Sequence, residues 1–366
     1  MLFCYPPEAA SENWLHDGLT TLLTRALAGE PNPLEDWLMV FPEAKRDEVA
    51  RKPTFIASLR RVVEQAALLT DPERAAYLSC MQAQNRIPQV FDPAEDLPDW
   101  PEQNEAFVKL VGELFEIAFK MLTPTGVRDR QYEFIYDRLP AHVCAFCGIE
   151  PLSAPDPIIP RESLDHYLSA ARYPFAAVNL RNLAPAGTKC NSSHKLSADM
   201  LRDQNNARRR CFDPFGQAVA TVSLRNSRPL EGPIKKMFVL PDWQIELLGD
   251  PDAVATWDTV YDIRTRYRLN VLDAELRNWL DHFALWCARE ASPPTTRDEL
   301  IALIGRYQQG VIQEGFADFL KRETFRMLSY QCQHGDSADR VAAWLISLLS
   351  PGTGAAAFSE GNPIAA

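Results

Sequence analysis

The sequence predicts a mainly α-helical protein that carries a small metal-binding module near its middle. Apolar residues recur at the i, i+3, i+4 spacing of amphipathic helices through most of residues 1–130 and 250–350. Between these regions, residues 142–195 hold three of the six His and three of the eight Cys. We expect four parts: a helical region 1–130, a module 131–216, a short β-pair followed by helices over 217–350, and a disordered tail 351–366.

The N-terminal region is expected to be a set of amphipathic helices. Apolar stripes predict helices over 12–27, 54–69, 71–83 and 102–121. Asp71 is the expected N-cap of the third helix, because Pro72 suits the first helical position. Such stripes are typical of core-facing surfaces, so we interpret this region as a scaffold.

The rest of the chain combines short extended pieces with helices. The pattern predicts a helix end over 131–139, a loop over 151–160, a strand over 162–167, a helix from 191 to about 202 and a turn over 212–216. Alternation over 218–224 and the apolar run 243–248 predict a pair of strands. Further helices are expected near 252–268, 270–289, 297–312, 316–333 and 336–349.

Three Cys of the module have the spacing of a zinc site. Cys144 and Cys147 are separated by two residues, which lets two thiolates reach one tetrahedral ion. Cys190 supplies a third thiol after a long insertion. The remaining Cys are scattered, which suits a reducing cytoplasm better than a disulfide framework. We therefore expect a structural Zn²⁺.

Side chains inside the insertion suit a harder ion. Asp165 and His166 are adjacent, and Asn191 directly follows Cys190. Mg²⁺ and Mn²⁺ prefer oxygen ligands, and a His beside such an ion can take a proton from an attacking water. We expect a catalytic Mg²⁺ (or Mn²⁺) held by Asp165 and Asn191, with His166 as the general base.

The module resembles the zinc-stapled HNH (ββα-metal) endonucleases. The resemblance rests on three motifs in this order: D-H at 165–166, R-N-L at 181–183 and C-N-S-S-H-K at 190–195. The resemblance is limited to about residues 142–215. It implies a strand–loop–strand–helix unit and four catalytic residues: His166, Asp165, Asn182 and Asn191. The expected role of Asn182 is to tie the loop to the backbone near His166.

The resemblance also implies an activity and a setting. The chain would hydrolyse phosphodiester bonds of DNA, most simply a duplex, and leave a 5′ phosphate. The zinc would act as a staple for a module with little core of its own. Modules of this kind between large helical regions often act as restriction or anti-phage effectors, which implies a regulatory partner such as an ATPase.

The fourth zinc ligand departs from the family pattern. Many zinc-stapled members have a second C-x2-C, whose first Cys would fall at Gly187. His194 is the preferred substitute, because a helix that begins at Cys190 would place it one turn later on the same face. Cys211 is the competing ligand, and it requires the chain to return to the site.

The module is basic relative to the rest of the chain. The net charge is −11, yet residues 142–213 hold nine Lys and Arg against seven Asp and Glu, so they carry +2 and the remainder −13. The Arg cluster after residue 207 is the densest, and a lysine follows Asn191 by one helical turn. We expect four basic side chains to contact DNA phosphates: Lys195, Arg208, Arg209 and Arg210.

Other classes of protein fit less well. A zinc deaminase needs an H-x-E or C-x-E triplet upstream of its Cys pair, and none precedes Cys144. A zinc-ribbon nucleic-acid-binding module or an interaction scaffold without catalysis remains an alternative, although neither needs Asp165, His166 and Asn191. No apolar run reaches the ~18 residues of a membrane helix, and no signal peptide is recognisable. We therefore expect a cytoplasmic protein without membrane contact.

Overall fold

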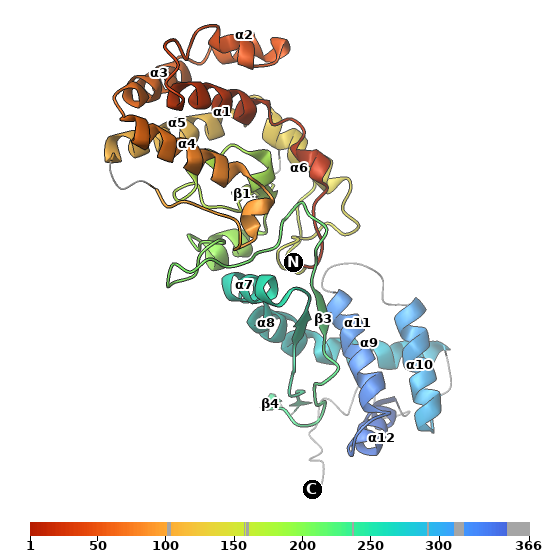
Figure 1. The fold of residues 1–366 in the computed structure, drawn as a ribbon. Helices are drawn as coiled ribbons and strands as arrows, with labels where there is room; N and C mark the ends of the chain where they lie inside the picture. Colours follow the sequence, from red (N-terminus) through yellow and green to blue (C-terminus); the bar gives the residue numbers. More distant parts are fainter. Residues whose placement is uncertain are drawn as a thin grey trace. The chain divides into compact units, whose positions relative to one another are not determined.

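Helices dominate the structure, as the sequence predicts (Figure 1). The computed structural model describes residues 1–100, 104–156, 158, 161–235, 238–290, 293–310 and 318–349, so the predicted tail lies outside it. The chain forms two compact units, which are Met1–Val219 with Asp250–Tyr261, and Ala220–Gly249 with Asp262–Ala366. Among the described residues, no helix combines the length and the apolar character needed to cross a membrane.

The first unit contains the predicted N-terminal helices and some that were not predicted. Its helices are α1 (Trp14–Leu27), α2 (Glu43–Ala50), α3 (Pro53–Ala67), α4 (Asp71–Asn85), α5 (Glu105–Met121), α6 (Val127–Tyr136) and α7 (Pro251–Tyr261). Short 3-10 turns are η1 (Pro7–Ala10), η2 (Trp37–Val40), η3 (Gln89–Phe91), η4 (Pro174–Ala176) and η5 (Leu180–Asn182). The predicted N-cap Asp71 is wrong by one residue, because Thr70 forms a capping box with Glu73.

The N-terminal helices and the central module share one hydrophobic core. Helix α3 packs against α5 and α1, and α1 also packs against α4 (Figure 1). The buried cluster continues from these helices into the module through Leu164, Phe175, Val178 and Leu183. The predicted division at residue 130 therefore does not separate two cores, and the helices act as the wall against which the module folds.

The module consists of a short hairpin and a short helix. Strand β1 (Leu164–His166) pairs antiparallel with β2 (Leu183–Pro185), with Asp165 opposite Ala184. The helix that follows, η6 (Cys190–Lys195), has π geometry. The predicted continuation to about residue 202 is wrong. Leu196 has φ 45°, and its amide closes the helix on Asn191 O at 3.1 Å.

The second unit is described by itself. Strand β3 (Thr221–Ser223) pairs antiparallel with β6 (Glu246–Leu248), which confirms the predicted strand pair. A second pair, β4 (Ile234–Lys235) with β5 (Phe238–Val239), was not predicted. The helices are α8 (Ile263–Arg266), η7 (Tyr267–Leu272), α9 (Asp273–Glu290), α10 (Arg297–Gly310), α11 (Asp318–Gln331) and α12 (Ala338–Leu349).

One predicted helix is divided between the two units. The segment expected near 252–268 ends as α7 in the first unit, and the chain then bends at Asp262, which has φ 51°. Helix α7 packs against η6 through a buried face that includes Trp257. The sequence does not indicate that α7 belongs to the first unit, because the apolar stripe continues across the bend.

Candidate functional site

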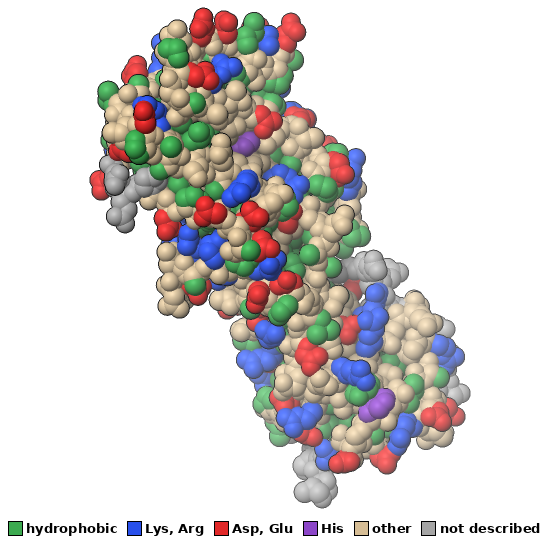
Figure 2. Space-filling view, in the orientation of Figure 1, with side chains coloured by type: hydrophobic (Ala, Val, Ile, Leu, Met, Phe, Trp, Pro, Cys, Tyr) green, Lys and Arg blue, Asp and Glu red, His purple; other side chains and the backbone are tan. Residues whose placement is uncertain are grey.

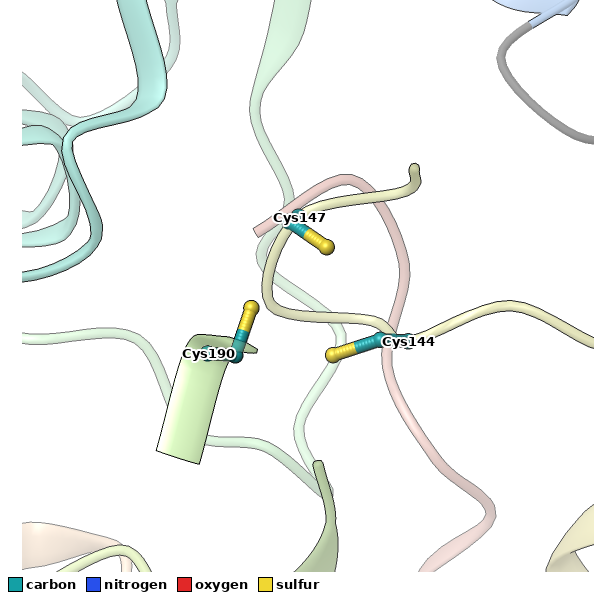
Figure 3. Close-up of side chains that lie close together, drawn as sticks. All are labelled: Cys144, Cys147 and Cys190. Atoms are coloured by element: carbon teal, nitrogen blue, oxygen red, sulfur yellow. The ribbon is translucent and has the colours of Figure 1, made fainter. Parts of the chain in front are cut away.

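Three buried thiols meet in the first unit, as their spacing predicts. The Sγ atoms of Cys144, Cys147 and Cys190 lie within 4.8 Å of one another, and Figure 3 shows them directed at a common space. The first two lie on a loop, and the third opens η6. Within the described part of the chain, this is the one group of three or more His, Cys, Asp or Glu side chains with metal-ligand spacing.

The chemistry of these donors fits a metal such as zinc. Burial raises the pKa of Cys144 well above its usual value, and hydrogen bonding to Cys144 and Cys147, followed by burial, does the same for Cys190. The thiols of Cys144 and Cys190 therefore keep their protons unless a cation compensates the thiolate charges. A divalent, thiophilic ion such as Zn²⁺ supplies that compensation.

The loop that carries Cys144 and Cys147, here called the thiol loop, is bound by two aromatic residues that the sequence analysis did not identify. The Tyr5 hydroxyl donates to Pro185 O at 2.6 Å and accepts from the Ala145 amide at 3.1 Å. The Trp257 indole of α7 donates to Phe146 O at 2.6 Å. Both aromatic side chains are buried, so the loop is fixed by contacts from distant parts of the chain.

Neither predicted fourth ligand belongs to the thiol group. His194 lies instead in the lining of a pocket with several Arg side chains. The prediction assumed an α-helix from Cys190, whereas η6 has π geometry and His194 is not among the residues of the thiol group. The Cys211 thiol lies against the Tyr167 hydroxyl, and burial raises its pKa to about 12.

Asp165 is paired with a lysine. The Lys195 ammonium lies 2.9 Å from Asp165 Oδ2 and donates to His166 O at 2.5 Å. Burial raises the pKa of Asp165, and the charge of Lys195 opposes that shift. Only 2 % of the Lys195 side chain is exposed. The charge of Lys195 therefore serves a buried carboxylate in this structure, and its predicted contact with a DNA phosphate stays a prediction.

His166 occupies the opposite face of β1, because successive strand residues alternate. Its Nε2 lies 2.9 Å from Ala177 O. A carbonyl only accepts, so Nε2 carries the proton and Nδ1 is the basic nitrogen of the neutral ring. Burial lowers the pKa of His166 to about 4, and the charges of Lys195 and Arg128 act in the same direction. The ring is therefore neutral at pH 7.

The pocket beside His166 is small and mostly apolar. It has a volume of about 290 Å³, and its walls include Phe115, Phe119, Pro174 and the carboxylate-bearing Glu116. The His166 ring lies 4.4 Å from the Phe119 ring, centre to centre. These apolar walls keep water away from the His166 imidazole, which disfavours its charged, protonated form.

Asn182 and Asn191 have different surroundings. Asn182 is fully buried; its Oδ1 accepts from Leu168 N at 2.6 Å, and its Nδ2 donates to Leu168 O and Ala176 O at 3.0 and 3.1 Å. It thus ties down the loop between the strands. Asn191 Nδ2 donates to Ser163 Oγ at 3.2 Å, and Ser163 precedes Asp165 by two residues. Asn191 and Asp165 are consequently on the same side of the extended segment.

The predicted Arg cluster lines a pocket with a volume of about 770 Å³. The basic lining residues are Arg172, Arg202, Arg208, Arg209 and Arg210, together with His194. The guanidinium groups of Arg208, Arg209 and Arg210 all bind other residues of the protein. Arg208 donates to Val90 O and Asp92 O at 2.9 and 3.0 Å, and Arg210 pairs with the Asp92 carboxylate at 2.9 Å. Arg209 donates to Asp199 O.

The charges on the drawn surface are mixed rather than separated. On the face shown in Figure 2, basic and acidic side chains of the first unit are interspersed. The Arg cluster is therefore a set of structural contacts that also borders a pocket, and not an open basic surface.

No protein-family model, curated protein or solved structure matches this chain.

Proposed function

We propose that the chain is a metal-dependent endonuclease of the HNH type that hydrolyses phosphodiester bonds of DNA. The order of elements supports it, since a hairpin carrying Asp165 and His166 is followed by a short helix carrying Asn191. The observation that carries the proposal is the state of His166. Its Nε2 is committed to Ala177 O, and its neutral ring leaves Nδ1 as a proton acceptor at pH 7.

Each side chain has a role in this proposal. His166 accepts the proton of the attacking water, and Asn182 holds the loop whose carbonyl orients the imidazole. Asp165 and Asn191 hold the ion from one side of the strand. A bound Mg²⁺ or Mn²⁺ supplies charge neutralisation at the phosphate and the leaving 3′ oxygen. Since Lys195 is paired with Asp165, its ammonium would have to leave the carboxylate or share it with the ion.

The proposal also names a phosphate contact that the sequence did not suggest. The Arg128 guanidinium lies 4.8 Å from the centre of the Phe119 ring, which itself packs against His166. Its Nε has no hydrogen-bond partner among the described residues. A cation beside the proposed base suits a phosphodiester oxygen.

The test is nicking of supercoiled plasmid DNA with Mg²⁺ or Mn²⁺. His166→Ala should lower the rate by at least ~10², the usual contribution of a general base, while zinc content stays at the wild-type level. His334→Ala is the matched control, since that exposed ring stacks on Tyr330 in the second unit. Cleavage by His166→Ala at the wild-type rate would show that the assignment is wrong.

A second function is favoured by a specific observation. The Asp165 carboxylate is occupied by Lys195, and the pocket beside His166 has mostly apolar walls. Both features suit a zinc-stapled nucleic-acid-binding protein or scaffold without catalysis. That protein would bind DNA in EDTA with a steep salt dependence and would not nick it with either ion.

The biological setting is part of the proposal. We place the activity in restriction or anti-phage defence in the cytoplasm, under a regulatory partner such as an ATPase. Phage infection of cells that express wild type or His166→Ala tests this setting. Protection by the wild type alone is the expected result, and equal plaque counts would remove the defence role.

A further inference from the structure

The thiol group supplies three ligands, and a structural zinc site is almost always four-coordinate. The fourth position of the sequence pattern falls on Gly187, three residues before Cys190. The structure shows what occupies the space beside this glycine. A Cβ on Gly187 would lie 2.5 Å from Glu150 Oε2 and 2.7 Å from Glu150 Cβ and Cδ. Glu150 therefore fills the place that a side chain at position 187 would need.

Glu150 is fixed at the rim of the thiol group. Its backbone carbonyl accepts from Cys144 N at 2.8 Å and closes the loop that carries the first two thiols. Its carboxylate accepts from the Lys189 and Cys190 amides at 2.8 and 3.2 Å. Both bonds place the carboxylate next to the third thiol as well.

One distance relates the carboxylate directly to the thiols. Glu150 Oε1 lies 3.8 Å from Cys147 Sγ. Two ligands of one tetrahedral zinc, with bonds of about 2.3 Å to sulfur and about 2.1 Å to oxygen, are separated by roughly 3.6 Å. The observed separation therefore matches that of two ligands on one ion. The carboxylate does not lie within 4.8 Å of all three thiols, so the Glu150 side chain has to turn towards the other two when an ion binds.

We infer that Glu150 is the fourth ligand, so that Cys144, Cys147, Cys190 and the Glu150 carboxylate bind one Zn²⁺. Carboxylate oxygen is an accepted zinc ligand. The two backbone amides orient the carboxylate and take up part of its charge, as groups around metal ligands commonly do. The inference concerns the zinc site alone and does not rest on the proposed nuclease activity.

The test measures zinc affinity by chelator competition and the ligand set by zinc X-ray absorption, both on the full chain. Wild type should show three sulfur ligands and one light-atom ligand. Glu150→Ala should lower the affinity at least ~10²-fold, the upper end of what loss of a supporting group costs. His194→Ala and Cys211→Ser are the matched controls and should keep wild-type affinity.

Glu150→Gln separates a ligand from a structural cap. The two amides bind different carboxylate oxygens, so a Gln oxygen can still accept from one of them, and a purely structural role predicts a clearly smaller loss than in Glu150→Ala. A ligand role predicts the same loss as Glu150→Ala, because the anionic oxygen is gone.

The swap Glu150→Gly with Gly187→Cys guards against misfolding of the single variants. It removes the obstructing side chain and supplies a thiol at the C-x2-C position, so it should bind zinc through four sulfurs. Wild-type affinity in both Glu150→Ala and Glu150→Gln, or loss in His194→Ala or Cys211→Ser, would overturn the inference. Failure of the swap to bind zinc would also count against it.

Discussion

At the scale of single residues, the buried pair of Asp165 and Lys195 affects both the stability of the proposed catalytic centre and its capacity to bind an ion. Both side chains are buried, and the ammonium is within 3 Å of both the carboxylate and a backbone carbonyl. Removing one member of a buried pair leaves an uncompensated charge, which costs far more than the pair itself contributes. The pair is therefore both a structural element and the competitor of any ion that binds Asp165.

The first prediction concerns Lys195→Met. This change keeps most of the volume and leaves Asp165 buried without its cation, so the free energy of unfolding should fall by about 3–5 kcal/mol. Added Mg²⁺ should restore part of the loss, because the ion can take the place of the ammonium. Urea unfolding with and without Mg²⁺ measures both effects.

Lys189→Met is the control for this experiment, because Lys189 is exposed and immediately precedes η6. It should change stability by less than about 0.5 kcal/mol. If Mg²⁺ has the same effect on wild type and on Lys195→Met, Asp165 is not a magnesium ligand.

A second prediction at this scale concerns His16. Burial lowers its pKa from 6.5 to about 4, and its Nδ1 has no hydrogen-bond partner within the described structure. The unfolded chain therefore binds more protons than the folded one between about pH 6.5 and 4, so stability falls as the pH falls through that window. Between pH 7.5 and 5.0 the contribution of His16 to this loss should be roughly 2 kcal/mol, in addition to that of His166, which has a similar shift.

His16→Leu should remove this part of the acid sensitivity. The measurement is urea unfolding of wild type and variant at pH 7.5 and 5.0. The wild type should lose more stability than the variant on acidification, and equal losses would show that His16 protonates as readily in the folded protein as in the unfolded one.

At the scale of elements, the loop between β1 and β2 is organised by one side chain. Asn182 uses its amide oxygen and both amide hydrogens on Leu168 and Ala176. The next residue along the loop, Ala177, supplies the carbonyl that orients His166. A strand pair of three residues per strand has few ladder bonds, so these side-chain bonds define the shape of the loop.

The prediction for this element is that Asn182→Ala destabilises the protein by at least about 2 kcal/mol. The change removes the side-chain partner of the buried Leu168 amide and carbonyl, while Ala176 O keeps its bond from Asn179 N; each unsatisfied buried group costs about 1–3 kcal/mol. Asn182→Asp should destabilise at least as much, since it keeps the acceptor but sets a buried carboxylate against the carbonyl oxygens of Leu168 and Ala176. Thermal unfolding compares these variants with Asn205→Ala, an exposed control; no difference from that control would contradict the role of Asn182.

At the scale of the whole molecule, the module that carries the three thiols is part of a larger unit. Its buried residues belong to the core of α1, α3, α4 and α5, and α7 reaches it from residues 251–261. The chain leaves the first unit at 219, returns at 250 and leaves again at 261. The module therefore has no core that could sustain it alone.

Limited proteolysis tests this organisation. No stable fragment of about 140–216 should appear, because Tyr5 and Trp257 bind the thiol loop from outside that range. Residues 1–219 and 250–261 should stay associated, and chelation of zinc should speed cleavage near Cys144. Early release of a stable 140–216 fragment, detected by mass spectrometry, would contradict a shared core.

Features that depend on local spacing could be predicted from the order of the residues. Helices α1, α3 and α5 and the strand pair β3–β6 appear where periodicity predicts them, because alternate or every third to fourth residues share a face in any fold. The thiol pair Cys144 and Cys147 follows the same logic. The third thiol joined them as predicted, since its ligand type and position in the motif identified it.

Features that depend on contacts between residues distant in the sequence became visible in the folded structure alone. It put Glu150 in the space left by Gly187, moved His194 away from the thiols and buried Lys195 against Asp165. It also returned α7 to the first unit. These outcomes follow from close packing and from the cost of burying an unpaired charge, and both depend on neighbours distant in the sequence.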